Sequence, residues 1–159
     1  MHTLRGFSLA LLAAVLGACA PATTATPGAP GAPTAPGAAT ARAAVEQFLA
    51  AVRAEDIQAM SAVWGTAQGS VRETMERTEM ERRAIIMHCF LTHDQFRIVN
   101  EAPGEGGRRV FRVALTRGTQ TRQPAFFTIA GPRSRWYVEN VELAAVREFC
   151  GMPPGAGAG

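Results

Sequence analysis

The groups best suited to chemistry lie in one short stretch, where His88-Cys89 is followed by His93-Asp94. Imidazole, thiolate and carboxylate groups can bind zinc or act as nucleophile and base. Adjacent residues on a helix point about 100° apart, so His88 and Cys89 rarely share one metal ion. Neighbours on a strand face opposite sides, which separates His93 from Asp94. We therefore expect no metal site and no cofactor, and His88, His93 and Asp94 remain candidates for an enzyme site.

A third thiol, Cys19, follows a segment that has the pattern of an export signal. Arg5 precedes an apolar run over residues 6–16, which is too short to cross a hydrocarbon core of about 30 Å as a helix. The next residues, Leu16-Gly17-Ala18-Cys19, resemble the lipobox of bacterial lipoprotein precursors. This resemblance implies cleavage before Cys19, lipid attachment to its thiol and anchoring to a membrane of the cell envelope. Ala20, where Asp would favour retention at the inner membrane, implies the outer membrane and a domain facing the periplasm.

Two other outcomes stay open for the cysteines. Cys19 could be a bystander of an ordinary secretory signal cleaved at Ala18 or Ala20. If Cys19 does carry lipid, Cys89 and Cys150 remain as a pair in an oxidising compartment, and a disulfide is expected. It would tie the end of the third predicted helix to the C-terminal end of the domain. Two free thiols would instead favour thiol chemistry at Cys89.

The charge pattern argues against nucleic acid as a partner. The net charge is +3, and all 16 basic residues are Arg. Arginines and glutamates alternate between residues 72 and 83, which is typical of a solvated helix surface. No basic run and no basic patch with aromatic residues is present in the sequence. Arg97, Arg112 and Glu139 fall on predicted strands, where they could orient an anionic ligand if they face inward.

Composition divides the chain into four parts. Residues 1–18 form the predicted lipoprotein signal peptide, and residues 19–41 form a tether rich in Pro, Ala, Thr and Gly. Such a tether cannot bury enough apolar surface to offset the entropy of ordering. Residues 42–150 form the predicted domain, and residues 151–159 a disordered tail.

The first half of this domain has the apolar spacing of helices. Residues 41–54 place Val45, Phe48, Leu49 and Val52 on one face. Asp56 is a plausible N-cap for a second short helix that begins at residue 57. A third helix is predicted over residues 71–90, with four side chains toward the core: Met75, Ile85, Ile86 and Cys89.

The second half changes to an alternating pattern that predicts antiparallel strands. The predicted strands cover residues 96–99, 110–116, 125–130 and 136–141, and turns are expected at 100–107, 118–119 and 131–134. In the last strand, Trp136, Val138 and Asn140 should face one side. A short helical turn over residues 143–149 closes the domain. Helices followed by about four antiparallel strands predict an α+β fold.

Two segments resemble the nuclear-transport-factor-two-like superfamily. The run from Ala44 to Ile57 is similar to its opening long helix, acidic turn and second helix, and Arg135–Val141 is similar to its final strand. The resemblance implies a cone in which helices pack on a curved sheet around a pocket. Trp64, Trp136 and Tyr137 are the candidate pocket residues. The resemblance does not imply an activity, because unrelated functions share one fold.

The leading hypothesis is a non-catalytic, lipid-anchored envelope protein that binds a protein partner or a small apolar ligand. A second hypothesis is an isomerase, dehydratase or hydrolase that uses His88, His93 or Asp94. A third is a structural or assembly accessory of the envelope. A cavity facing His93 or Asp94 would favour an enzyme, whereas a filled interior and an exposed apolar patch would favour the accessory.

Overall fold

The computed structural model describes residues 35–151, and most of the predicted tether, Cys19 and the signal segment lie outside the described residues. Four helices come first: α1 (Ala41–Arg53), α2 (Ile57–Val63), α3 (Val71–Thr74) and α4 (Arg77–Leu91). A small hairpin, β1 (Gly65–Thr66) and β2 (Gly69–Ser70), lies between α2 and α3. Within the described range, no helix has the length and apolarity to cross a membrane.

The main sheet is antiparallel and follows the helices in sequence. Its strands are β3 (Gln95–Pro103), β4 (Arg109–Arg117), β6 (Ala125–Ala130) and β7 (Trp136–Val141), in the order β3-β4-β6-β7. A short fifth strand, β5 (Gln120–Arg122), pairs with the end of β4. The 3-10 helix η3 (Leu143–Phe149) closes the unit. This arrangement confirms the predicted α+β class with helices before antiparallel strands.

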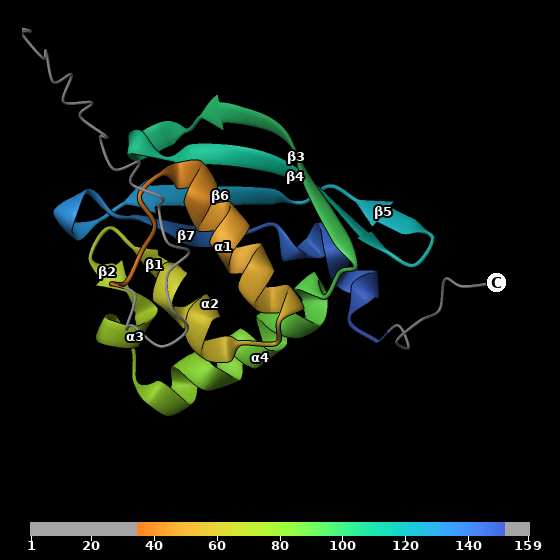
Figure 1. The fold of residues 1–159 in the computed structure, drawn as a ribbon, viewed down its shortest axis with the longest axis horizontal. Coiled ribbons are helices and arrows are strands. Elements are labelled where there is room, and N and C mark those ends of the chain that lie inside the picture. Colours follow the sequence, from red (N-terminus) through yellow and green to blue (C-terminus); the bar gives the residue numbers. More distant parts are fainter. Residues whose placement is uncertain (1–34, 152–159) are drawn as a thin grey trace, which may run out of the picture. The chain divides into compact units, whose positions relative to one another are not determined.

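Helix α1 lies across one face of the sheet (Figure 1). Thr40 caps it by accepting a hydrogen bond from the Ala43 amide at 3.1 Å. The predicted apolar stripe is confirmed, because all four of its side chains are buried: Val45, Phe48, Leu49 and Val52. The ring of Phe48 packs edge-on against Phe126 of β6, with centroids 6.4 Å apart. Burial of this stripe is the main favourable term that joins the helices to the sheet.

The packed part of the chain begins before the expected boundary at residue 42. Ala38 is fully buried and exchanges two backbone hydrogen bonds with Trp136, at 2.8 and 2.9 Å. Gly37 has a φ of +80° and lies so close to the Tyr137 ring that an added Cβ would fall 2.7 Å from it. Residues 37–41 therefore belong to the fold, although their composition resembles that of the tether.

The single helix predicted over residues 71–90 is wrong in two respects. The chain breaks into α3 and α4 at Met75, which is extended, and Glu76 then caps α4 by accepting from the amides of Thr78 and Glu79. The predicted core face is also displaced, because Ile85 and Ile86 are 59% and 50% exposed. The break resets the helical phase, so the residues buried along α4 are Met80, Ala84 and Leu91.

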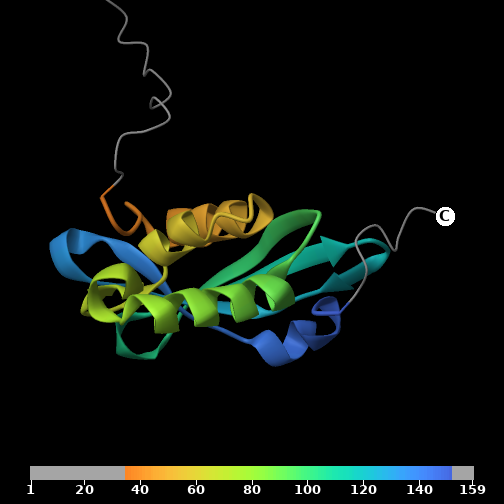
Figure 2. The ribbon, with the colours of Figure 1, turned by 90° about the horizontal axis from the view of Figure 1, so that it is seen from below.

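Helix α4 lies beside α1 and α2 rather than on the sheet surface, as Figure 2 shows from below. The sheet also extends further than predicted. Strand β3 runs through the expected turn at residues 100–103 and carries a bulge at Val99. Strand β5 occupies residues after the Gly118 turn that were not assigned to any strand. In both places the partner strand β4 supplies backbone hydrogen bonds that the local pattern does not reveal.

Strand β7 departs from simple alternation. Thr128 pairs with Val138, but Phe127 pairs with Asn140, so Glu139 is an extra residue in β7. The bulge brings Val138 and Val141 to the same buried face and turns Asn140 away, contrary to the predicted alternation. Bulges of this kind redirect a side chain and recur near functional sites.

Candidate functional site

A cavity of about 110 Å³ lies beside the bulge in β7. Its walls come from the end of α2, from α4, from β7 and from the start of η3. Seven residues line it: Trp64, Met87, Val138, Glu139, Asn140, Val141 and Leu143. The backbone of Trp64 forms a parallel bridge with Val138, which holds the indole at this edge of the sheet. Trp64 is thus the one predicted pocket residue that lines this cavity.

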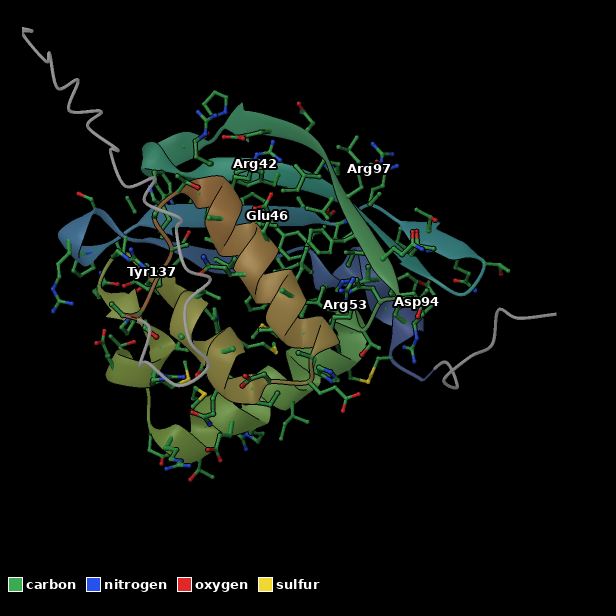
Figure 3. All side chains as sticks on the ribbon, viewed as in Figure 1. Arg42, Glu46, Arg53, Asp94, Arg97 and Tyr137 are labelled. Atoms are coloured by element: carbon green, nitrogen blue, oxygen red, sulfur yellow. A yellow bond between two sulfur atoms is a disulfide. The ribbon has the colours of Figure 1, made fainter. Side chains whose placement is uncertain are left out.

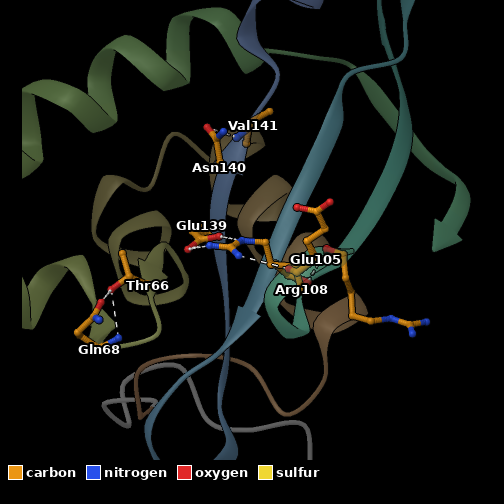
Figure 4. A network of polar contacts seen from close by, with 9 residues as sticks. Thr66, Gln68, Glu105, Arg108, Glu139, Asn140 and Val141 are labelled. Carbon is orange, nitrogen blue, oxygen red and sulfur yellow. Dashed lines mark hydrogen bonds and ion pairs between the residues drawn. The ribbon is translucent and has the colours of Figure 1, made fainter. Parts of the chain in front are cut away.

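The polar part of the wall is a bonded network (Figure 4). Arg108 donates from Nε and Nη2 to the two carboxylate oxygens of Glu139, at 2.5 and 2.9 Å. Both side chains are partly covered, with exposed fractions of 36% and 19%. The hydrogen bond to Glu139 raises the pKa of Arg108 above its ordinary value. The Asn140 side-chain oxygen accepts from the Val141 amide at 2.9 Å.

The other two predicted pocket residues lie elsewhere. Tyr137 is buried, and its ring fits against Gly37, Gly65 and Gly131, where any added Cβ would fall within 2.8 Å of it. Burial is the main cause that raises the pKa of its hydroxyl. Trp136 is half-buried, packs against the core and pairs with Ala38 through its backbone. Both residues belong to β7, and through these contacts they hold Gly37 and Ala38 against this strand.

A larger hollow of about 590 Å³ is an open groove between α1 and α2. Its floor consists mainly of small side chains, including Ala50, Ala54, Ala59 and Ala62. Asp56 lies at its edge, where it caps α2 by accepting from the Ala59 amide at 2.9 Å, as predicted. Arg72 also lies at the edge, and its Nε donates to the Ser61 hydroxyl at 3.3 Å.

Cys89 and Cys150 form a disulfide, as expected from the sequence, with their Cα atoms 4.8 Å apart. The bond joins α4 to the end of η3 across 61 positions of sequence. These two elements also supply Met87 and Leu143 to the cavity wall. The disulfide therefore constrains two walls of the cavity, and Cys89 is not a free thiol.

His93 is buried at the junction of α4 and β3. Its Nδ1 lies 2.8 Å from the Leu91 carbonyl oxygen, and its ring packs edge-on against Phe96. Its Nε2 is buried and has no hydrogen-bond partner. Burial is the main cause that lowers the pKa of this imidazole, and the positive charge of Arg53 lowers it further, against the Leu91 carbonyl and Asp94. His93 lines neither hollow.

Asp94 and His88 are also outside the two hollows. The Asp94 carboxylate accepts from the Gly118 amide at 2.7 Å, which fixes the turn between β4 and β5. His88 is half-buried, and its carbonyl oxygen accepts from the Thr92 hydroxyl. Figure 3 shows Asp94 near the end of α1 that carries Arg53, with Arg97 further along β3. Within residues 35–151, no three His, Cys, Asp or Glu side chains come together as a metal site.

The three strand residues considered for an anionic ligand have separate positions. Arg97 is exposed, and Arg112 pairs with Glu142 at 3.0 Å. Only Glu139 lines a hollow, and its negative charge is unsuited to an anion. Sequence reasoning missed Met87 and Leu143, which line the cavity, and Arg108, which pairs with Glu139, because only non-local packing brings them to this place. The only local signals were the aliphatic residue Leu143 shortly after β7 and the polar residue Glu139 within this strand.

The geometry thus gives one small, partly open hollow at β7 and a more open groove between α1 and α2, and the three candidate residues His88, His93 and Asp94 line neither of them. The sheet order and the helix-first topology describe a fold, and a fold alone does not assign a function. Comparison of the chain with protein-family models, with curated proteins and with solved structures finds no match.

Proposed function

We propose that this chain is a lipid-anchored protein of the cell envelope whose domain is a non-catalytic binding or accessory module. The observation that carries the proposal is Leu16-Gly17-Ala18-Cys19 directly after an apolar run. The disulfide supports it, because a Cys89–Cys150 bond suits an oxidising compartment and leaves Cys19 available for lipid. The outer membrane, with the domain in the periplasm, is the proposed location.

The arrangement of the domain supports a cone of the nuclear-transport-factor-two-like kind. Helix α1 packs across the sheet, and the cavity lies where helices, the last strand and η3 meet. Most of the interior is filled by side chains such as Phe48, Phe111 and Phe126, which are fully buried. The site for a ligand is accordingly the small cavity at β7, and a large central pocket is not part of the proposal.

A binding role is favoured over an enzyme by what the polar groups contact. Glu139 is bonded to Arg108, and Asp94 is bonded to a turn amide. A general base needs hydrogen-bond reach to a proton on a bound substrate. Among residues 35–151, none of His88, His93 and Asp94 lines either of the two hollows, so the isomerase, dehydratase or hydrolase alternative is not favoured.

The test of the anchor is metabolic labelling with radioactive palmitate. The wild-type protein should incorporate label, and Cys19→Ala should abolish it. The matched control is a Cys89→Ala/Cys150→Ala double variant, which removes the other two cysteines and should keep the label. Label that persists in Cys19→Ala, or a full-length uncleaved precursor in the cytosol, would contradict the proposal.

The accessory form of the proposal is favoured by one observation on α4. Ile85 is 59% exposed and Ile86 is 50% exposed, and they are adjacent on the outer side of this helix. Exposed apolar side chains that gather together mark sites of protein contact more often than isolated ones do. A photo-crosslinking amino acid at position 86 should capture a protein in intact cells, whereas the same group at the exposed position 77 should not.

A further inference from the structure

We propose that the cavity beside β7 binds a compact, uncharged molecule that is mostly apolar and has a single hydrogen-bond donor. This inference deepens the proposed binding role and rests on it. The juxtaposition that carries it is five apolar residues beside Glu139, whose charge is matched by Arg108, and Asn140, whose side-chain oxygen is already bonded to the Val141 amide.

The volume of the cavity limits the ligand to a few atoms. Apolar cavities of about 150 Å³ hold a benzene ring, so 110 Å³ suits a branched group of about five non-hydrogen atoms. An aromatic or longer ligand would have to displace Val138 or Trp64, and Val138 belongs to the closely packed core.

The lining selects a mostly apolar ligand. Trp64 and Met87 come from the helical layer, Val138 and Val141 from the strand, and Leu143 from η3. Together they offer no hydrogen-bonding group except the indole N–H of Trp64. A ligand that carried several polar groups would lose its hydration without new partners, which costs binding free energy.

Of the two polar residues in the lining, Asn140 is exposed and its side-chain oxygen is bonded to the Val141 amide, so Glu139 supplies the acceptor for the ligand. It is the bulge residue of β7, and Arg108 holds both its oxygens. An ionised carboxylate has about four acceptor positions, so Glu139 can still accept a hydrogen bond from a ligand O–H or N–H group. Because Arg108 offsets the charge of Glu139, neither an anion nor a cation gains much Coulomb attraction here, and either would lose hydration against the apolar wall.

The walls are held in place before any ligand enters. The backbone bridge of Trp64 to Val138 fixes one side, and the disulfide between α4 and η3 fixes the other. A preorganised site loses little conformational entropy on binding, which matters most for a ligand that can make few contacts.

Three probes with the same four-carbon skeleton test the inference: isobutanol, isobutyrate and isobutylammonium. The full chain with Cys19→Ala, in detergent and with its disulfide intact, is titrated while the two tryptophan indole N–H signals are followed by NMR. Isobutanol should shift the Trp64 signal and saturate at millimolar concentration, with little change at Trp136. Isobutyrate and isobutylammonium should bind at least about tenfold more weakly, in line with discrimination at small pockets.

Variants then connect the response to the cavity. Leu143→Phe fills the cavity and should weaken isobutanol binding by about tenfold or more. If Leu143→Phe does not fold, Val141→Leu is the second variant that fills the cavity. Glu139→Gln leaves the positive charge of Arg108 without its carboxylate partner, so the affinity for isobutyrate should rise relative to the affinity for isobutanol. The matched control, Glu142→Gln, removes the similar carboxylate that pairs with Arg112 and should leave the order unchanged.

Several outcomes would overturn the inference. These are a response that never saturates, equal shifts at Trp64 and Trp136, unchanged binding in both filling variants, or a charged probe that binds more tightly than isobutanol. Palmitate labelling of the cavity variants separates the two proposals, because the lipid anchor does not depend on the cavity. Labelled protein that binds none of the probes would refute this inference alone.

Discussion

Removal of the Cys89–Cys150 disulfide should strongly destabilise the domain. The proposed change is Cys89→Ser with Cys150→Ser, made in a Cys19→Ala chain so that no other thiol remains. The bond joins residues 61 positions apart, so without it the unfolded chain regains the entropy of a long open loop. The folded state loses no other covalent constraint.

The expected loss follows from loop length. In the chain-entropy treatment, a closed loop of this size stabilises the folded state by about 4 kcal/mol at 25 °C. The free energy of unfolding of a domain of this size is typically about 5–15 kcal/mol. The variant should therefore lose a large share of its stability, while α1 and the sheet still bury the same core.

Urea unfolding followed by far-ultraviolet circular dichroism measures the loss. With a slope of about 2 kcal/mol per molar urea, the midpoint should fall by about 2 M. The Cys19→Ala protein with its disulfide, when treated with reductant, should behave like the variant, and without reductant it should show no free thiol. A midpoint that moves by less than about 0.5 M, or two free thiols in the untreated protein, would refute the reasoning.

Three further predictions concern single residues. The pKa of His93 in the folded protein is lowered from 6.5, so as the pH falls the unfolded chain binds this proton before the folded protein does. The contribution of His93 to the free energy of unfolding should be complete above pH 6.5. Below pH 6.5 it should decline by at most about 1.4 kcal/mol per pH unit, until the pKa of the folded state is passed. His93→Gln should flatten this decline in pH-dependent urea unfolding, and an unchanged slope would exclude His93 as its source. Asp56→Ala removes the α2 cap and should cost about 1 kcal/mol, whereas the same change at exposed Glu55 should not produce this loss. Ala38→Asp buries an unpaired carboxylate at a fully covered position and should lower the melting temperature by several degrees, and an unchanged value would mean that this segment does not pack on β7.

Local patterns were sufficient where one element alone satisfies its own requirements. The stripe of α1 and the Asp56 cap depend on spacing within a few residues, and both are confirmed. The α+β class also follows from the change in apolar period along the chain. The pairing of Cys89 with Cys150 needed only the count of cysteines and the assumption of an oxidising compartment.

Local patterns were not sufficient for α3 and α4, which were predicted as one helix although they have different helical phases. The run from residue 71 to residue 90 contains no Gly or Pro, so no residue type marked the break at Met75. Glu76 is an uncommon N-cap, and the exposure of Ile85 and Ile86 depends on which side of α4 meets α1 and α2.

By itself the sequence determined the change from helices to antiparallel strands and the apolar face of α1, because each depends on neighbouring residues, and it is also the ground for the proposed lipid attachment at Cys19. Tertiary structure decided what no window of sequence contains: the bulge that redirects Glu139, its pairing with Arg108 across 31 positions, and the closeness of Trp64, Met87 and Leu143. The physical reason is that a bulge arises from the register of two paired strands, and a cavity from the meeting of four elements. Neither is a property of any one segment.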